Sequence, residues 1–355
     1  MRLAIHHNKG SFSERWQAYC DKHQIPYTLV NCLDTNIIQQ LGRADGLLWH
    51  WNHQDPAEIL IARHVVLAAE TAGLVVFPST RTCWHFDDKV AQKYLLEAVG
   101  APLAPTHIFF KIEDAVKWID DASFPKVFKL RKGAGSQNVR LVRTRDEARV
   151  LAKTAFSTGF RPVPSYWNDA HKRYRVARRQ GALLGVLRRL PRTLINIRQL
   201  NGMIGREKGY LYLQDFIPNN QFDTRVTVIG NRAFAYIRRV RPSDFRASGS
   251  GDIDYDPKNI RLECIKIAFD VSGKIGSQSM AFDFVLDSEG RPLIVEVSYC
   301  YIPEFVYNCP GHWNDRLSWH AGHLWPQDAI LQDILENTGG YQPHLQRNQQ
   351  STSFL

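Results

Sequence analysis

Short apolar runs alternate with helical patterns over the first part of the chain. Each run is typical of a strand, and the stretches between the runs carry apolar residues at helical spacing. Strands are predicted at 2–5, 27–30, 46–49 and 74–77, with helices from residue 13, up to residue 41 and over 55–72. Asp55 followed by Pro56 marks a helix start, because proline fits the first helical turn. Strands that alternate with helices predict a parallel sheet, and therefore a small α/β domain over residues 1–85.

A second set of elements follows this domain. After a helix over about 87–99 and an extended proline-containing linker, strands are predicted at 106–110, 126–130 and 138–142, with helices at 113–120 and 145–154. Further strands are predicted at 211–216, 225–229 and 232–239, and a helix at about 258–271. The fold class is thus α/β (α+β). The predicted organisation is an N-terminal domain, a small subdomain, a basic helical insert, a C-terminal subdomain and a polar, disordered tail, at 1–85, 86–156, 157–208, 209–340 and 341–355.

One predicted hairpin carries two isolated carboxylates. The run 280–286 is apolar except for Asp283, and the run 292–297 is apolar except for Glu296. A turn that ends in Gly290 joins the two strands and brings the carboxylates opposite each other, where like charges repel. A divalent cation between them would remove the repulsion, and Mg²⁺ that is also held by substrate phosphates suits a small set of oxygen ligands. The alternative is a pair of edge-strand acids that face solvent.

Composition is that of a soluble globular protein. The chain has 355 residues, of which 44% are hydrophobic, enough for two or three domains with their own cores. It contains no run of eighteen apolar residues, and its N-terminus is too polar for a signal peptide. Six cysteines form no CxxC pair, which argues against a zinc site and fits free thiols. These features predict a cytoplasmic protein.

The net charge of +10 is concentrated in one segment. Residues 157–208 contain twelve lysines and arginines but only two acidic residues, so this segment alone carries the net charge of the chain. Interleaved apolar residues predict an amphipathic basic helix. Its partner could be an acidic glycan or an anionic membrane surface, which would make the protein peripheral at the inner face of the membrane. Nucleic acid is disfavoured because no aromatic stacking platform accompanies the charge, and a solvated helical face is the plain alternative.

Two lysines that precede the basic segment are candidates for phosphate binding. Lys129 ends a predicted strand, and Gly133, Gly135 and Ser136 follow it. Glycines allow backbone N–H groups to approach phosphate oxygens, and the lysine supplies the counter-charge. Lys89 opens a helix just before the linker and would bring a second cation to the same cleft. An ordinary turn is the alternative for the glycine loop.

Two further groups follow the basic segment. A strand ends with an acceptor and apolar groups of the kind that an adenine base requires, at Gln214, Asp215, Phe216 and Ile217. The second group brings acids and guanidiniums together, and arginine grips phosphates and carboxylates with two parallel hydrogen bonds. It consists of Asp223, Arg225, Arg238, Arg239, Arg246, Ala247 and Ser248.

In this order the features resemble the ATP-grasp superfamily over residues 86–301, and the block DTRVTVIGNRAFAYIRRVRPSDFRAS (223–248) is similar to the ribosomal-protein glutamate ligases. The resemblance implies an ATP-grasp fold with an N-terminal pre-ATP-grasp domain, in which 86–156 is the lid and 209–340 the catalytic subdomain. The cofactors it implies are ATP and Mg²⁺. Two departures concern Ser298, where the family usually has Asn, and Asp215, where it usually has Glu.

The resemblance also assigns roles to residues. ATP phosphates would be contacted by Lys89, Lys129, Arg246 and the glycine loop, adenine by Gln214, Asp215 and Ile217, ribose by Asp223, and Mg²⁺ by Asp283, Glu296 and Ser298. Arg225 and Arg239 would hold the acyl phosphate or the acceptor.

The implied activity is that of an ADP-forming carboxylate–amine ligase that makes an amide through an acyl phosphate, with small carboxylate and amine substrates. Joining an amino acid to an acidic sugar of a surface glycan would use the basic segment. The alternatives are an ATP-grasp kinase of a small hydroxyl substrate and a non-catalytic nucleotide- or membrane-binding module. Near the C-terminus, His320 and His323 stand at helical spacing, and the tryptophans beside them favour an aromatic cluster over a metal site.

Overall fold

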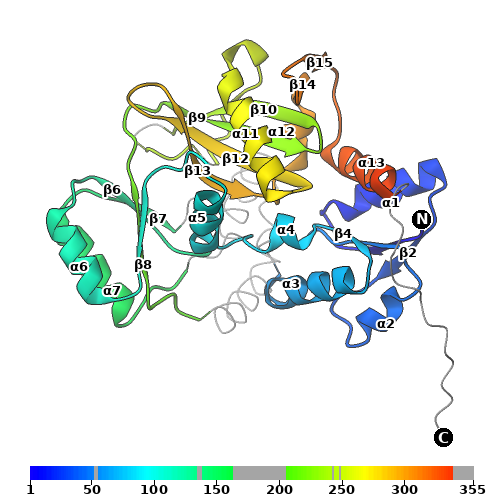
Figure 1. Cartoon of the computed structure of the whole chain (residues 1–355), viewed down its shortest axis with the longest axis horizontal. Coiled ribbons are helices and arrows are strands. Elements are labelled where there is room, and N and C mark those ends of the chain that lie inside the picture. The colour runs from blue at the N-terminus through cyan, green and yellow to red at the C-terminus, as the bar shows by residue number, and fades with distance from the viewer. Residues whose placement is uncertain (52–54, 134–137, 163–204, 242–243, 248, 339–355) are drawn as a thin grey trace, which may run out of the picture.

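The computed structural model describes residues 1–51, 55–133, 138–162, 205–241, 244–247 and 249–338. Three regions lie side by side: an N-terminal α/β domain, a small sheet with two helices on its outer side, and a central sheet between them (Figure 1). The basic segment 163–204 and the tail from residue 339 lie outside the described residues, so the predictions made for them stay predictions. The same holds for the domain boundaries.

The N-terminal domain contains the parallel sheet that the alternating pattern predicts. Its strand order is β2-β1-β3-β4, and every pairing is parallel. The side chain of Asp55 accepts a hydrogen bond from the Ala57 amide (2.8 Å) and Pro56 opens the helix, as predicted. The elements are β1 Leu3–His6, α1 Ser13–His23, β2 Tyr27–Val30, α2 Ile37–Leu41, β3 Gly46–Leu48, α3 Pro56–Thr71, β4 Val75–Phe77 and the unpredicted α4 Thr80–Cys83.

The small sheet is built from two parts of the chain that the basic segment separates. Its order is β5-β8-β6-β7, so β8, which follows the basic segment, lies between two strands that precede it. Two helices, α6 and α7, bury their apolar sides on one face of this sheet (Figure 1). At the edge of the described chain, Phe160 and Glu207 exchange two backbone hydrogen bonds of 2.8 Å. The elements are α5 Lys89–Ala98, β5 Thr106–Phe109, α6 Ile112–Asp121, β6 Lys126–Lys129, β7 Val139–Val142, α7 Arg145–Phe156 and β8 Leu211–Asp215.

The central sheet has the order β13-β12-β9-β10-β14-β15, with β11 paired to β10. Helix α11 packs on one face, and the expected start of this helix moves to Leu262 because Pro257 first opens a short 3₁₀ turn (Figure 1). Gly290 has φ +77°, as its place in the predicted hairpin turn requires. The elements are β9 Phe222–Ile229, β10 Arg232–Arg239, β11 Ile253–Asp254, η1 Pro257–Asn259, α11 Leu262–Ile275, β12 Ser279–Leu286 and β13 Pro292–Ser298.

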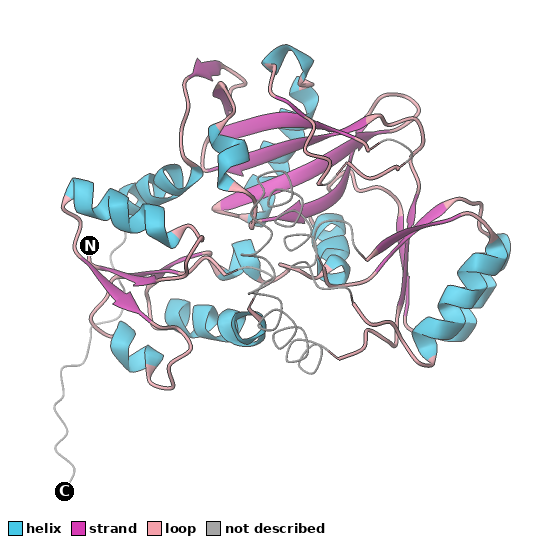
Figure 2. Ribbon diagram, turned by 180° about the vertical axis from the view of Figure 1, so that it is seen from behind, coloured by secondary structure: helices cyan, strands magenta, loops and turns pink. Residues whose placement is uncertain are grey.

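The C-terminal elements join the central sheet to the N-terminal domain. They are α12 Pro303–Tyr307, β14 Gly311–Asn314, β15 Trp319–Ala321 and α13 Pro326–Thr338. Helix α13 lies against α1, where Arg15 donates two hydrogen bonds to Asp328 at 2.8 and 2.6 Å (Figures 1 and 2). The helical spacing assumed for His320 and His323 is wrong, because His320 belongs to β15 and stacks on His312 of β14. None of the described helices is long and apolar enough to cross a bilayer.

Candidate functional site

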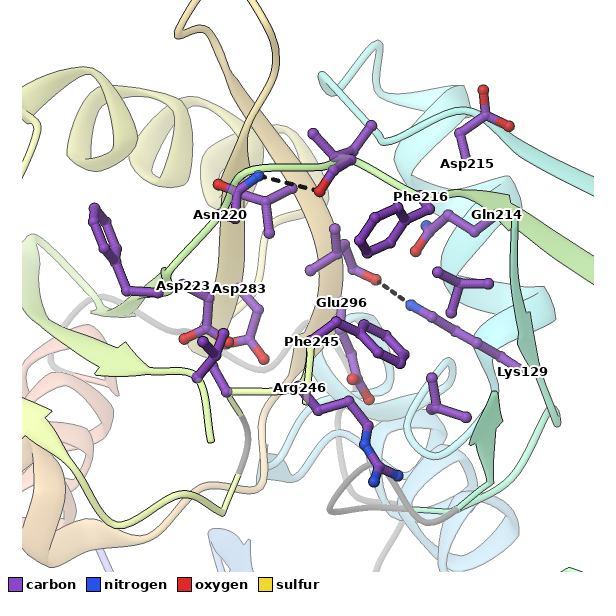
Figure 3. Close-up of a pocket in the computed structure, with 18 of the residues that line it drawn as sticks. Lys129, Gln214, Asp215, Phe216, Asn220, Asp223, Phe245, Arg246, Asp283 and Glu296 are labelled. Carbon is purple, nitrogen blue, oxygen red and sulfur yellow. Dashed lines mark hydrogen bonds between the residues drawn. The ribbon is translucent and has the colours of Figure 1, made fainter. Parts of the chain in front are cut away.

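A pocket opens between the small sheet and the central sheet. It encloses about 870 Å³ of space not filled by atoms, part of which is open to solvent. Strands β6 and β8 form one wall, β9, β12 and β13 form the other, and the segment that follows β8 connects them (Figure 3). Ten of the residues predicted from the sequence line it: Lys129, Gln214, Asp215, Phe216, Ile217, Asp223, Arg246, Ala247, Asp283 and Glu296.

Lys129 brings a buried ammonium group to this pocket from the end of β6. Its Nζ donates to the Val295 carbonyl oxygen at 3.1 Å, so the side chain bridges the two sheets (Figure 3). A bulge in β13 makes this contact possible, because the pairing of β12 with β13 skips Val295 between Glu296 and Ile294. Burial lowers the pKa of Lys129 from 10.5 to about 8; the charge of Glu296 raises it and that of Lys89 lowers it further. The charge of Asp283 also raises it, so burial is the main cause of the lowered pKa.

Lys89 reaches the same place from the first turn of α5. Its Nζ donates to the Gly133 carbonyl oxygen (2.8 Å) and lies 3.5 Å from Glu296 Oε1. The Asp88 side chain caps this helix. Asp87 accepts a hydrogen bond from the Gly133 amide, so both the amide and the carbonyl of Gly133, at the start of the glycine loop, are hydrogen-bonded. Gly133 has φ +115°, which favours glycine. The predicted Gly135 and Ser136 lie outside the described residues.

The side chains at the strand end expected to frame adenine are hydrogen-bonded to neighbouring residues. Gln214 donates from Nε2 to the Thr106 hydroxyl at 2.9 Å. The Asp215 carboxylate points away from Lys129 and accepts from Lys126 at 2.6 Å, with His107 at 3.5 Å (Figure 3). The described contacts of both side chains are thus with neighbouring residues, and in the segment after β8 the carbonyls of Ile217 and Pro218 accept from Asn220 Nδ2 at 3.3 and 3.2 Å.

Apolar contacts complete this end of the pocket. Phe216 lies edge-on to Phe245 at 5.8 Å between ring centroids, which supplies a flat apolar wall. Asn220 fixes the connecting segment, because its side chain both donates to and accepts from the backbone of Leu286 at 3.0 and 2.9 Å. The sequence analysis gave Asn220 no role.

Two arginines and two aspartates form a buried network on the floor of the pocket. Arg225 donates from Nε and Nη2 to the two Asp283 oxygens at 2.6 and 2.7 Å. Arg238 donates in the same two-bond manner to Asp223 (2.7 and 2.6 Å), and its Nη2 also lies 2.8 Å from Asp283 Oδ2. Strand register places these residues side by side on β12, β9 and β10. Removing one partner of such a buried pair costs about 3–5 kcal/mol.

The two predicted carboxylates are opposite each other, but their surroundings differ. Asp283 pairs with Glu296 in the hairpin register, as predicted. Burial alone would raise the pKa of the Asp283 carboxyl, yet the guanidiniums of Arg225 and Arg238 hold it well below its usual range. Glu296 is 37% exposed and has Lys89 beside it. Ser298 exchanges hydrogen bonds with the backbone of Cys300 at 3.0 and 3.1 Å.

The remaining predicted residues divide between the pocket and the surface. Arg246 lines the pocket and donates to the Asp244 carboxylate from Nε and Nη2, which orients its guanidinium. Ala247 is buried in the lining, and Ser248 lies outside the described residues. Arg239 points to the other face of β10, where it is exposed and meets Asp254 at 3.2 Å.

Arg238 is therefore the member of the arginine pair that reaches the site. Alternation along a strand shows that only one of the two arginines can face the site, but both faces of β10 are apolar, so the sequence pattern does not say which one. Within the residues that the structure describes, no three His, Cys, Asp or Glu side chains gather closely enough to hold a metal ion by themselves.

Comparison with solved structures finds a similar fold in several proteins. D-alanine–D-alanine ligase from Bacillus anthracis is similar at a TM-score of 0.58 and 14% identity, over 96% of this chain and 99% of that one. A RimK domain ATP-grasp protein from Sphaerobacter thermophilus is similar at 0.50 and 16%, over 84% and 90%. N5-carboxyaminoimidazole ribonucleotide synthetase from Thermotoga maritima is similar at 0.53 and 14%, over 84% and 68%. Comparisons with family models and with curated proteins gave no match.

Proposed function

We propose that this chain, which has the ATP-grasp fold predicted from its sequence, is an ADP-forming ligase that joins a carboxylate to an amine. One observation carries the proposal. Two buried lysines from separate elements, Lys89 and Lys129, converge on Glu296 beside a pocket that Phe216 and Ile217 line. A triphosphate supplies the negative charge that this arrangement lacks, and the apolar lining suits a base.

The pocket supports a defined orientation for ATP. Adenine would lie against Phe216 and Ile217 with its edge on the backbone after β8, and its phosphates would extend toward Lys89, Lys129 and Arg246. Both Asp223 oxygens accept from Arg238, and each keeps a lone pair with which a ribose hydroxyl could bond.

Magnesium fits this donor set only in part. Glu296 offers a half-exposed carboxylate at the end where the phosphates would lie, which suits a cation held mostly by phosphate oxygens. The Asp283 oxygens already accept from two guanidiniums, and the Ser298 hydroxyl bonds to local backbone. Glu296 is therefore the residue that would hold Mg²⁺, and a bound ion would neutralise charge on the transferred phosphate.

The chemistry asks the protein for positioning and charge stabilisation. A substrate carboxylate oxygen attacks the terminal phosphorus of ATP, the bond to the bridging oxygen breaks, and an acyl phosphate and ADP form. An amine then attacks the acyl carbon, and inorganic phosphate leaves as the amide forms and the amine loses its proton. Lys89, Lys129 and Arg246 would stabilise the charge that moves to the leaving oxygen in the first step, and the closed pocket would exclude water from the acyl phosphate.

The segment 157–208 supports a proposal for the acceptor. Its excess of ten positive charges suits an acidic partner, such as a uronic-acid glycan to which an amino acid is joined, or an anionic membrane surface on which that glycan is made. This part of the proposal rests on sequence alone.

Trapping with hydroxylamine tests the reaction without knowledge of the natural amine. Purified protein with ATP, Mg²⁺ and single carboxylates, including amino acids and uronic acids, should form a hydroxamate together with ADP in equal amounts. Lys129→Met should abolish both products. ADP formation that depends on a hydroxyl compound and gives no hydroxamate would instead identify a kinase, and nucleotide binding without turnover on any carboxylate would favour a binding module.

A further inference from the structure

The three donors around Asp283 leave it a poor ligand for a metal ion. Oδ1 accepts from Arg225 Nε at 2.6 Å, and Oδ2 accepts from Arg225 Nη2 at 2.7 Å and lies 2.8 Å from Arg238 Nη2. The carboxylate thus has two guanidiniums in the positions that a cation would occupy. All three side chains are buried, with exposed fractions of 7% for Asp283, 17% for Arg225 and 6% for Arg238.

The charges of the network balance without a metal. Arg225 and Arg238 carry two positive charges, and Asp223 and Asp283 carry two negative charges. A divalent ion at Asp283 would have to enter beside two guanidiniums that are fixed by two-bond contacts and shielded from water, where like charges repel strongly. Glu296 on the facing strand differs, because its carboxylate is partly exposed and its ion-pair partner Lys89 lies 3.5 Å away, farther than the guanidiniums lie from Asp283.

We propose that Asp283 is the shared counter-ion of Arg225 and Arg238, a positioning residue, and that the site takes a single divalent cation through Glu296 and the phosphates of the nucleotide. The part that concerns the cation rests on the proposed nucleotide site, whereas the part that concerns Asp283 does not.

The two roles of Asp283 predict opposite effects in the protein without ligands. If a bound metal were the only counter-charge of Asp283 and Glu296, neutralising one of them in the metal-free protein would relieve their repulsion and raise the melting temperature. A counter-ion role predicts the reverse, since Asp283→Asn leaves one positive charge of the network uncompensated in a buried place.

The melting temperatures of the wild type, Asp283→Asn, Arg225→Met and the double variant decide between these roles. We expect Asp283→Asn to melt several degrees below the wild type or to fail to fold. The variant Asp283→Asn with Arg225→Met should recover most of the loss, because Arg238 and Asp223 remain as a neutral pair, and Arg225→Met alone should be destabilised. A melting temperature of Asp283→Asn at or above that of the wild type, or a double variant no better than the single ones, would overturn the counter-ion role.

Counting bound Mn²⁺ by electron paramagnetic resonance, with saturating ADP, tests the cation. We expect one tightly bound Mn²⁺ per wild-type protein. The Asp283→Asn variant should bind the same number, and the double variant replaces it if it does not fold. In Glu296→Gln the affinity for Mn²⁺ should be at least tenfold weaker. Two bound ions in the wild type, one of which is lost with Asp283, would overturn the single-ion inference. Failure of the wild type to bind ADP would refute the nucleotide site and with it the single-ion inference, while the melting data would still decide the role of Asp283.

Discussion

Replacing Lys129 by methionine should make the protein more stable and less able to bind nucleotide. The Lys129 ammonium is buried between the two sheets, and burial lowers its pKa to about 8 although Glu296 attracts it. Methionine keeps an unbranched side chain of similar length and removes the charge. The substitution therefore separates the contribution of the Lys129 charge to nucleotide affinity from its effect on the free energy of unfolding.

The size of the effect follows from the pKa. A tenfold change in proton affinity corresponds to about 1.4 kcal/mol, so a pKa that falls from 10.5 to about 8 means that the charged form costs the fold about 3 kcal/mol at pH 7. The substitution also removes the hydrogen bond to the Val295 carbonyl, which offsets about 1 kcal/mol of the gain. We expect the free energy of unfolding to rise by about 2 kcal/mol.

The pH dependence identifies the cause. Below pH 8 both the folded and the unfolded wild type hold the Lys129 proton, so the full cost is present. Between pH 8 and 10.5 the folded protein has released this proton and the unfolded chain has not, so the wild type gains stability as the pH rises. Above that window the cost is gone, and the advantage of the variant should disappear.

Urea unfolding followed by tryptophan fluorescence at pH 7 and above pH 10 measures this, with ADP titration as the second readout. We expect ADP to bind at least tenfold more weakly to the variant. Lys126→Met is the matched control: it lies on the same strand but its ammonium is paired with Asp215 at 2.6 Å, so its loss should destabilise the protein, by about 1 kcal/mol at most. A Lys129→Met protein that is less stable at pH 7, or whose advantage does not change with pH, would refute the reasoning.

Two further predictions concern the base and the acceptor. Asp215→Ala should lower the melting temperature, while the affinity for ATP changes by less than about threefold. The reason is that the Asp215 carboxylate points away from the pocket toward Lys126. A tenfold loss of ATP affinity in calorimetry would mean that Asp215 contacts the base. Reversing Arg175, Arg178 and Arg179 to Glu should raise the KM of an acidic acceptor by about tenfold at low salt, less as salt rises, and leave ATP affinity unchanged; an unchanged KM together with unchanged binding to anionic vesicles would contradict it.

Local signals in the sequence were sufficient for most elements of the fold. The cap at Asp55, the turn at Gly290 and the opposition of Asp283 and Glu296 each depend on a few neighbouring residues, and the structure confirms all three. Strands β14 and β15 were missed, because their short runs of tryptophan, histidine and glycine show no clear alternation.

The partners of the site residues depend on strand order, which local patterns do not encode. Strand β9 lies between β12 and β10, and only this order brings Arg225 against Asp283 and Arg238 within reach of the same carboxylate. The bulge that turns the Val295 carbonyl toward Lys129 is a further example, because a one-residue change of register leaves no mark in the apolar pattern. The sequence therefore predicted ten residues that line the pocket, but not that Arg239 faces away from it, nor which residues neutralise one another.

The two backbone hydrogen bonds between Phe160 and Glu207 have a consequence for how the segment between them could be replaced. Because the two residues are hydrogen-bonded to each other, the small sheet meets a closed loop rather than two separate chain ends. The entropy of closing such a loop grows only with the logarithm of its length, so replacing residues 161–206 by a linker of about six residues would change it by only about 2 kcal/mol. Segments of very different length and charge can therefore be exchanged at this junction while β8 keeps its place.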